Sequence, residues 1–176
     1  MKKLIFLCVF MLFNNEIVIV DFNKSIKVND WYQTNDSVMG GISTSKMIIN
    51  DNGFGVFKGS VSTENNGGFA MTRLPVNVDL NKSSKNIILR VKGDGKKYQF
   101  RIKSKKYQRY WYVKSFQTSN KIEDIVIPLN SFYASFRGYK LNIDNFSGNT
   151  IKEIAVLIGN KKNEDFKLTI EKISVK

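Results

Sequence analysis

The sequence predicts an all-β fold, either a sandwich or a barrel, and three observations support this prediction. Clusters of turn-forming Asn, Asp, Gly and Ser recur at residues 50–53, 65–68, 93–95 and 146–149. Short runs rich in β-branched and aromatic residues lie between these clusters. No amphipathic helix longer than two turns is visible. Short strands at even spacing, without a helical period, are typical of β-sandwiches and barrels.

The strands are expected where the apolar runs lie, and one short helix is expected between two of them. The runs are at residues 17–22, 68–74, 86–92, 107–116, 122–127, 151–158 and 166–175. Residues 129–136 are the candidate short helix. The chain has 176 residues, which suits a single domain. Hydrophobic residues make up 42% of it, which excludes a wholly disordered chain.

Composition also limits the chemistry. The chain has no histidine, which excludes Ser-His-Asp and Cys-His catalysis and histidine metal sites. Cys8 is the single cysteine, so neither an intrachain disulfide nor a thiolate metal cluster can form. We expect no cofactor and no metal.

The formal net charge is +13, carried mostly by lysine. The simplest interpretation is a solvated lysine surface, and the alternative is a surface for phosphate or anionic lipid. Residues 92–121 interleave lysines with aromatic residues, as single-strand nucleic-acid binders do. About half of those aromatic residues are needed for the core, so we do not expect a nucleic-acid partner.

The amino terminus resembles the first two zones of a secretory signal peptide. Lys2 and Lys3 precede an uncharged apolar run at residues 4–13, which is shorter than the roughly 20 residues of a membrane span. Residues 14–16 offer no small-x-small cleavage site. We expect a signal peptide or hydrophobic segment at 1–15, a single β-sandwich domain at 16–176, and export to the periplasm or envelope. A cytoplasmic protein with a buried first strand is the alternative.

Residues 86–103 are predicted to form a hairpin whose register is well defined. A two-residue turn at Asp94 and Gly95 would place only apolar residues opposite each other. The predicted pairs are Val91 with Tyr98, Leu89 with Phe100, and Ile87 with Ile102. A shift of one residue would break every pair, so this face is expected in the core.

The other face of that hairpin would carry Arg90 and Arg101 as diagonal neighbours. The next strand would add an aromatic side chain from the segment 110–112, with Tyr110 and Tyr112 as the candidates. Arginines beside an aromatic ring provide forked donors and a stacking plane, as a sugar-, phosphate- or peptide-binding surface requires. The alternative is a loop-covered face on which the arginines form structural ion pairs.

Two further segments, at 35–43 and 59–70, are dense in turn-forming residues. We expect Asp36 and Glu64 to be buried acceptors of backbone hydrogen bonds, with lowered pKa values, and we count Asn65 and Asp94 with them as structural polar hubs. Asp94 is explained by its turn. Paired carboxylates could hydrolyse glycosides, but no set of nucleophile, base and orienting group is visible. No catalytic residue and no enzymatic activity are therefore expected.

Taken in order, the motifs resemble those of the complex I intermediate-associated protein 30 family. The matching stretches are 21–22, Trp31 with 35–43, 57–59 with 62–70, Arg73, 89–96 with Tyr98 and Arg101, Tyr112 with 115–118, 127–128 and 136–138. The resemblance covers about residues 18–175. Because the family motif places an arginine at Arg137, this residue joins the candidate ligand-binding set.

The resemblance implies a galactose-binding-like jelly-roll β-sandwich. Mitochondrial members of the family are chaperone-like assembly factors for respiratory complex I, so the resemblance implies a non-catalytic binding or assembly module with a protein client. The same fold is used by many carbohydrate-binding modules, so the alternative is a glycan-binding protein of the bacterial envelope. This chain is expected to depart from the mitochondrial members, because its first residues resemble an export signal and not a transit peptide.

Overall fold

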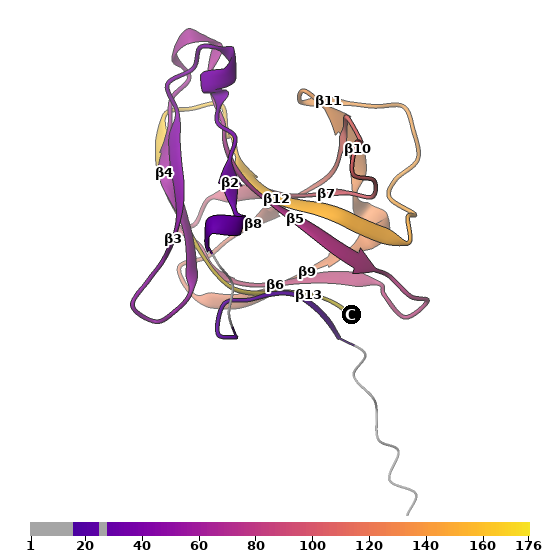
Figure 1. The fold of residues 1–176 in the computed structure, drawn as a ribbon. Coiled ribbons are helices and arrows are strands. Elements are labelled where there is room, and N and C mark those ends of the chain that lie inside the picture. Colours follow the sequence, from indigo (N-terminus) through magenta and orange to yellow (C-terminus); the bar gives the residue numbers. More distant parts are fainter. Residues whose placement is uncertain (1–15, 25–27) are drawn as a thin grey trace, which may run out of the picture.

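Two antiparallel sheets packed face to face build the fold, as Figure 1 shows for the computed structural model, which describes residues 16–24 and 28–176. The six-stranded sheet has the order β3-β4-β13-β6-β9, with β1 paired to β13. Its strands are β1 (Ile17–Asp21), β3 (Thr44–Ile49), β4 (Gly55–Val61), β6 (Asn86–Lys92), β9 (Ile122–Pro128) and β13 (Glu164–Val175). The all-β, jelly-roll prediction is confirmed.

The seven-stranded sheet has the order β11-β10-β8-β7-β12-β5-β2. Its strands are β2 (Tyr32–Gln33), β5 (Ala70–Asp79), β7 (Lys97–Lys103), β8 (Trp111–Gln117), β10 (Tyr133–Phe136), β11 (Tyr139–Lys140) and β12 (Thr150–Ile158). In the described part of the chain, four short 3-10 turns connect strands, namely η1 (Val28–Asp30), η2 (Asp36–Met39), η3 (Glu64–Asn66) and η4 (Leu129–Ser131). The expected helix at 129–136 is only η4, because β10 takes residues 133–136.

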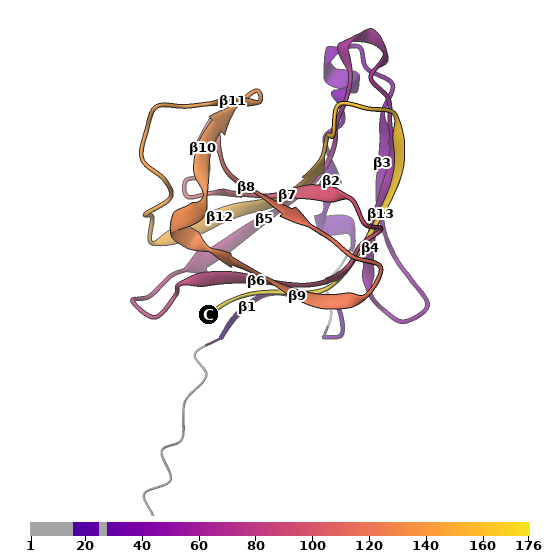
Figure 2. The same cartoon turned by 180° about the vertical axis from the view of Figure 1, so that it is seen from behind.

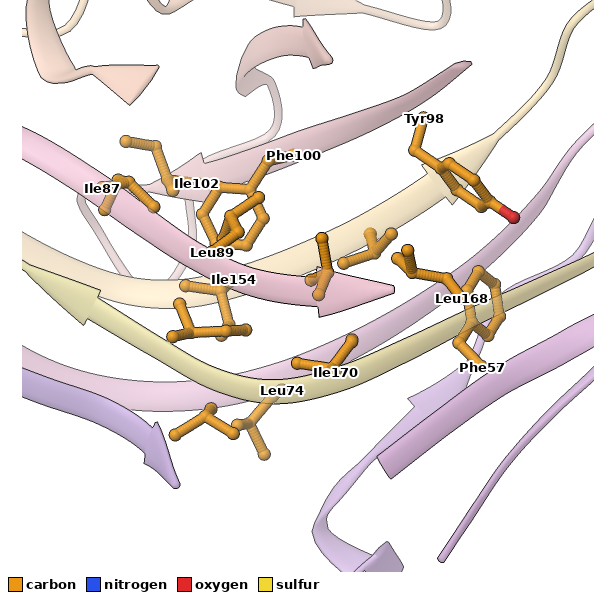
Figure 3. Packing of buried hydrophobic residues seen from close by; sticks show 14 of the residues in the cluster. Phe57, Leu74, Ile87, Leu89, Tyr98, Phe100, Ile102, Ile154, Leu168 and Ile170 are labelled. Carbon is orange, nitrogen blue, oxygen red and sulfur yellow. The ribbon is translucent and has the colours of Figure 1, made fainter. Parts of the chain in front are cut away.

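The core lies between the two sheets and is rich in aromatic side chains. Phe57 of one sheet and Phe100 of the other are fully buried, and Phe132 packs edge-on against Phe100 with ring centroids 6.3 Å apart. Figure 3 shows side chains from both sheets converging on this layer. This inner layer is what the alternating apolar residues of the strands build, because every second side chain of a strand points to the same face.

The predicted hairpin is wrong in one respect. β6 pairs with β13 and β9, whereas β7 pairs with β12 and β8, so the two strands belong to different sheets. Leu89 and Phe100 are both buried, as expected, but they meet across the sandwich instead of side by side (Figure 3). Apolar alternation fixes which face of a strand is buried and not which sheet the strand joins. In consequence Arg90 and Arg101 lie on outer faces of opposite sheets.

Asp94 holds this crossing between the sheets. Its carboxylate accepts hydrogen bonds from the Tyr98 hydroxyl at 3.0 Å, from the Lys96 ammonium at 2.9 Å and from the Lys167 backbone N–H at 2.9 Å. Tyr98 belongs to β7 and Lys167 to β13, so one side chain links both sheets. The carboxylate thereby satisfies a buried hydroxyl whose apolar surroundings offer it little else.

Asp36 joins the η2 loop to the segment that precedes β5. It is 1% exposed, and its carboxylate accepts hydrogen bonds from Ser43 N–H at 3.0 Å, Gly68 N–H at 2.6 Å and Phe69 N–H at 3.2 Å. Burial raises the Asp36 pKa, but these bonds and the Ser43 hydroxyl outweigh burial and leave the pKa below its ordinary value. A side chain at Gly41 would lie 2.4 Å from this carboxyl, which explains the glycine.

Glu64 does not share this role, and the expectation that it is buried is wrong. Its side chain is exposed, as is that of Asn65. Asn65 and Asn66 both have positive φ, at 53° and 60°, so the backbone turns sharply and leaves the polar side chains in solvent. Asparagine tolerates this left-handed conformation better than most residues.

The expected signal segment at 1–15 lies outside the described residues. Among the residues that are described, no helix is long and apolar enough to cross a membrane, and no cluster of three acidic or thiol side chains is placed to hold a metal ion.

We predict that Asp36→Asn lowers the free energy of unfolding by about 2–3 kcal/mol, because the amide nitrogen would face backbone donors and leave them unpaired. Urea denaturation at pH 7 measures this. Glu64→Gln is the matched control and should change stability by less than about 0.5 kcal/mol, as expected for an exposed side chain. Equal losses in both variants would contradict the assignment of Asp36 as the hub.

Candidate functional site

The outer face of the seven-stranded sheet carries an open pocket of about 420 Å³. Figure 1 shows β10 and β11 standing upright on one side of this face and the upper ends of β3 and β4 on the other. The pocket lies against the β10–β11 side. Its lining residues come from five strands and their loops, and they are Asn66, Phe69, Met71, Arg101, Arg109, Trp111, Phe136, Arg137, Gly138 and Leu157.

Apolar side chains that face away from the core form the floor of the pocket. Met71, Trp111 and Leu157 belong to a second small hydrophobic cluster, separate from the main core, and Phe69 packs against it. Trp111 is 9% exposed, so the floor offers an indole that is held firmly by its neighbours. An apolar floor with a few polar groups above it is the usual composition of a ligand pocket.

Arg101 enters the pocket from β7. Its Nε and Nη2 donate to the Gln99 side-chain oxygen at 3.1 and 2.6 Å, which fixes the guanidinium plane. Burial lowers the pKa of the Arg101 guanidinium to about 10. Within the part of the chain that the structure describes, no carboxylate lies within ion-pair distance of Arg101. Its charge is therefore partly desolvated without an opposite charge beside it.

Arg109 and Arg137 form the wall together with Phe136. The two guanidinium carbons lie 6.0 and 5.5 Å from the centroid of the Phe136 ring, within the range of cation–π contact. Arg137 has φ 51° and Gly138 has φ 85°, so both residues of the β10–β11 turn are left-handed. This turn type suits a tight two-residue hairpin and projects Arg137 beside the pocket.

A charged cluster around Glu153 adjoins the floor. The Glu153 carboxylate accepts hydrogen bonds from the Tyr32 hydroxyl at 2.5 Å and from Arg73 Nε at 2.7 Å, and the Lys103 ammonium lies 3.0 Å away. Lys103 Nζ also lies 4.3 Å from the centroid of the Trp111 ring. The cluster therefore holds one face of the Trp111 ring in place through a cation–π contact.

The pKa values in this cluster follow from the same contacts. Burial raises the Glu153 pKa, but hydrogen bonds from Tyr32 and Lys103 and the charge of Arg73 outweigh burial and leave the pKa below its ordinary value. Burial and the Glu153 carboxylate raise the pKa of Tyr32 to about 12. The phenol is therefore neutral and the carboxylate charged at neutral pH.

Of the residues singled out in the sequence, the structure brings Arg101 and Arg137 into one pocket. Arg90 is elsewhere, on the outer face of the six-stranded sheet, where its guanidinium lies 3.2 Å from Asp124 and 3.2 Å from Glu171. Those carboxylates raise the pKa of Arg90. Arg90 thus forms structural ion pairs, as the alternative interpretation expected, and it does not line the pocket.

Tyr110 and Tyr112 also lie away from the pocket. Tyr112 is paired with Ile102, so its ring points to the inner side of the sheet, where it lies 5.3 Å from Phe146 and 5.4 Å from Tyr110 between ring centroids. The contact with Tyr110, together with burial, raises the pKa of Tyr112 to about 12. The aromatic residue that does join Arg101 from the segment 110–112 is Trp111.

Arg109, Trp111 and Phe69 are among the lining residues that the sequence did not indicate. Arg101 is paired with Val113, so Trp111, two residues earlier, lies on the same outer face. The sequence alone does not show which face of the sheet each residue of β8 occupies. That depends on the length of the β7–β8 loop, because one residue more or less would move every side chain of β8 to the other face. Arg109 lies in that loop, outside any strand, so no alternation of apolar and polar residues indicates where its side chain points.

Two other hollows are less suited to a ligand. One of about 400 Å³ is lined by Asp94 and Lys167, which already bond each other, and by several asparagines. A wider one of about 630 Å³ lies among loops rich in Asn, Ser and Lys near Phe146. Neither combines several guanidinium groups with an aromatic floor.

The fold is a jelly-roll β-sandwich that is similar to the folds of carbohydrate-binding modules. The family 11 module from Clostridium thermocellum, in complex with a β-1,3-1,4-mixed-linked tetrasaccharide, is 19% identical, with 91% of this chain and 94% of that chain covered and a TM-score of 0.64. The family 11 module of the C. thermocellum cellulosomal cellulase Lic26A-Cel5E is 17% identical, with 89% and 92% covered and a TM-score of 0.65. An agarase, AgWH50C, matches at 10% identity over 92% of this chain and 24% of its own, with a TM-score of 0.60.

The family model described as Complex I intermediate-associated protein 30 matches residues 20–170, and the chain belongs to this family. The resemblance of the sequence motifs is confirmed. A search of curated proteins gave no match. At these low identities, the likeness to the carbohydrate-binding modules shows the shared fold.

We predict that Glu153→Gln destabilises the protein by about 1.5–3 kcal/mol at pH 7, because Arg73, Lys103 and Tyr32 lose a charged acceptor. The lowered pKa means that the charged carboxylate stabilises the fold above the ordinary glutamate pKa of about 4.3 and that this contribution is lost as the pH falls below it. The difference in unfolding free energy between the unmodified protein and the Glu153→Gln variant should therefore shrink as the pH is lowered from 5 to 3.

Urea titrations at several pH values measure this difference. Asp124→Asn, which removes one partner of the exposed Arg90 pair, is the control and should leave the unfolding free energy unchanged across the same range. A Glu153→Gln effect that does not depend on pH would show that the charge of Glu153 is irrelevant.

Proposed function

We propose that this protein is a non-catalytic glycan-binding module and that the pocket on the seven-stranded sheet is its binding site. One observation carries the proposal, namely that the aromatic residues Trp111 and Phe69 line the same pocket as the three arginines Arg101, Arg109 and Arg137. A sugar ring has an apolar face that packs on an aromatic side chain and hydroxyl oxygens that accept hydrogen bonds from forked donors.

Two further points support this proposal. The similar C. thermocellum module is known with a bound tetrasaccharide, on a fold that this chain shares over nearly its whole length. The pocket also has a volume of about 420 Å³, within the range of pockets that hold small ligands.

The absence of catalysis is part of the proposal. Glycoside hydrolysis generally requires two carboxyl groups on either side of the scissile bond. Among the described residues, the lining of the pocket includes no aspartate or glutamate. Glu153, on the same sheet face, is held by two cations and a phenol, and these contacts leave its pKa below the ordinary value, so it is a weak base.

We predict that Phe69→Ala weakens binding to any soluble polysaccharide that the protein retards in affinity gel electrophoresis by about tenfold, equivalent to about 1.4 kcal/mol. The ring is only partly buried, so thermal melting should show a folded variant. Tyr107→Ala is the matched control, because Tyr107 is an aromatic residue that is 86% exposed outside the pocket lining. Equal retardation of all three proteins would exclude this pocket as the binding site.

A second candidate function is the one that the resemblance to the complex I intermediate-associated protein 30 family implies, a chaperone-like protein-binding role in the assembly of respiratory complex I. The observation in its favour is the edge strand β9 (Figure 2), on which Ile122 and Val126 are 51% and 58% exposed. An edge strand has unpaired backbone groups, to which an extended segment of a client can add as a further strand.

We predict that, if this second function holds, the protein suppresses light scattering by thermally unfolded citrate synthase and that Ile122→Lys/Val126→Lys abolishes the suppression. Ile143→Lys, at a site that is 47% exposed in a loop, should suppress aggregation as the unmodified protein does. Failure of the unmodified protein to suppress aggregation would count against this role and would leave the glycan proposal intact.

A further inference from the structure

We propose that the pocket recognises an acidic glycan, with the carboxylate or sulfate group of one sugar held by Arg101 and Arg137. This inference rests on the proposed glycan-binding function and deepens it by naming the class of ligand.

The distribution of arginine is the first argument. The chain contains 28 basic residues, of which only five are arginines. Three of these, Arg101, Arg109 and Arg137, line this one pocket, and Arg73 lies on the same sheet face. Compositional bias can fill a surface with lysine, but it does not gather the rare guanidinium groups in one place. Guanidinium is the group that binds carboxylate and sulfate-like oxyanions in a bidentate manner.

The charge balance of the pocket is the second argument. Three cationic groups line it, and its described lining contains no acidic residue. Glu153, on the neighbouring part of the face, is already shared by Arg73, Lys103 and the Tyr32 hydroxyl. The positive charge in the pocket is therefore not neutralised by the residues around it. An anionic ligand would supply the missing charge at a site where partial burial strengthens the attraction.

The state of Arg101 is the third argument. Its only hydrogen-bond acceptor among the described residues is the neutral side-chain oxygen of Gln99, which takes two of its five N–H groups. Burial disfavours the charged form of this guanidinium, as its lowered pKa indicates. A buried cation normally has an ionic partner, since removal from water costs several kcal/mol. Gln99 thus orients the fork while the remaining N–H groups are available to a ligand.

Arg137, in the wall of the pocket, provides the second contact to the acidic group of the ligand. Arg109 and Arg137 both lie against the Phe136 ring, so the ring holds two like charges beside the pocket through cation–π contacts. Neither guanidinium has an ion-pair partner among residues 16–24 and 28–176. Arg101, Arg137 and Trp111 all line this one pocket, so a sugar ring bound in it would lie within reach of both guanidinium groups and could present its acidic substituent to them.

The test compares acidic and neutral polysaccharides by isothermal titration calorimetry with the full chain. The acidic probes are polygalacturonate, alginate and chondroitin sulfate, and the neutral probes are fully methyl-esterified polygalacturonate and mixed-linkage β-glucan. We expect at least one acidic probe to bind tenfold or more tightly than the neutral probes, with an affinity that falls as NaCl is raised from 50 to 300 mM.

The variants locate the contact. Arg101→Lys keeps the charge but loses the fork, and we expect about tenfold weaker binding. Arg137→Gly should weaken binding by a similar factor and cannot strain the turn, because glycine favours the positive φ of this position. Lys46→Ala removes an exposed charge from the outer face of the six-stranded sheet and should leave the affinity unchanged.

The outcomes separate the two proposals. Equal binding of acidic and neutral glycans, weakened by Phe69→Ala but not by Arg101→Lys, would overturn the acidic ligand and leave the glycan function standing. Binding of poly-glutamate with no binding of any glycan would overturn both and indicate a peptide ligand. An equal loss of binding in Lys46→Ala would reduce the effect to net charge and would also overturn the assignment.

Discussion

The inner apolar faces of the two sheets have to meet, and the connection between β6 and β7 is what makes them meet. Leu89 of β6 and Phe100 of β7 belong to consecutive strands, but they enter the core from opposite sheets. This connection between the sheets places the Tyr98 hydroxyl in the core, where it needs a hydrogen-bond partner. Asp94 is that partner and bonds to the backbone of β13 at the same time. Everything on the outer faces, including the arginine pocket, takes its position from this arrangement.

Much of the fold follows from the sequence because the physical rule behind it is local. Alternation in residues 86–92 and 97–103 shows which side chains are buried, and all of those expected in the core are there. The same alternation is compatible with neighbours in a sheet and with partners across a sandwich. The separation of Arg90 from Arg101 could therefore not be predicted, since it depends on contacts with β12 and β13, which are distant in sequence.

The candidate site is less predictable for related reasons. Arg101 and Arg137 were identified, but the aromatic partner was assigned to the wrong residues because the parity of β8 depends on the loop at 104–110. Asp36 and Glu64 look alike in sequence, each beside glycines. Only the three-dimensional path of the chain brings the amides of Gly68 and Phe69 to Asp36, while the left-handed turn at Asn65 leaves Glu64 in water.

The pocket joins two parts of unequal stability. Its floor comes from β5, β7, β8 and β12, which are long strands paired on both sides. Its wall comes from β10 and β11, of which β11 has two residues at the edge of the sheet and is joined by a turn with two left-handed residues. Amide hydrogens in the floor are expected to exchange only when the whole sheet opens, whereas those of the wall can exchange through local opening. The lifetime of a bound ligand would then depend on the opening of this small hairpin, which carries Arg137, while Arg101 and the apolar floor stay in place.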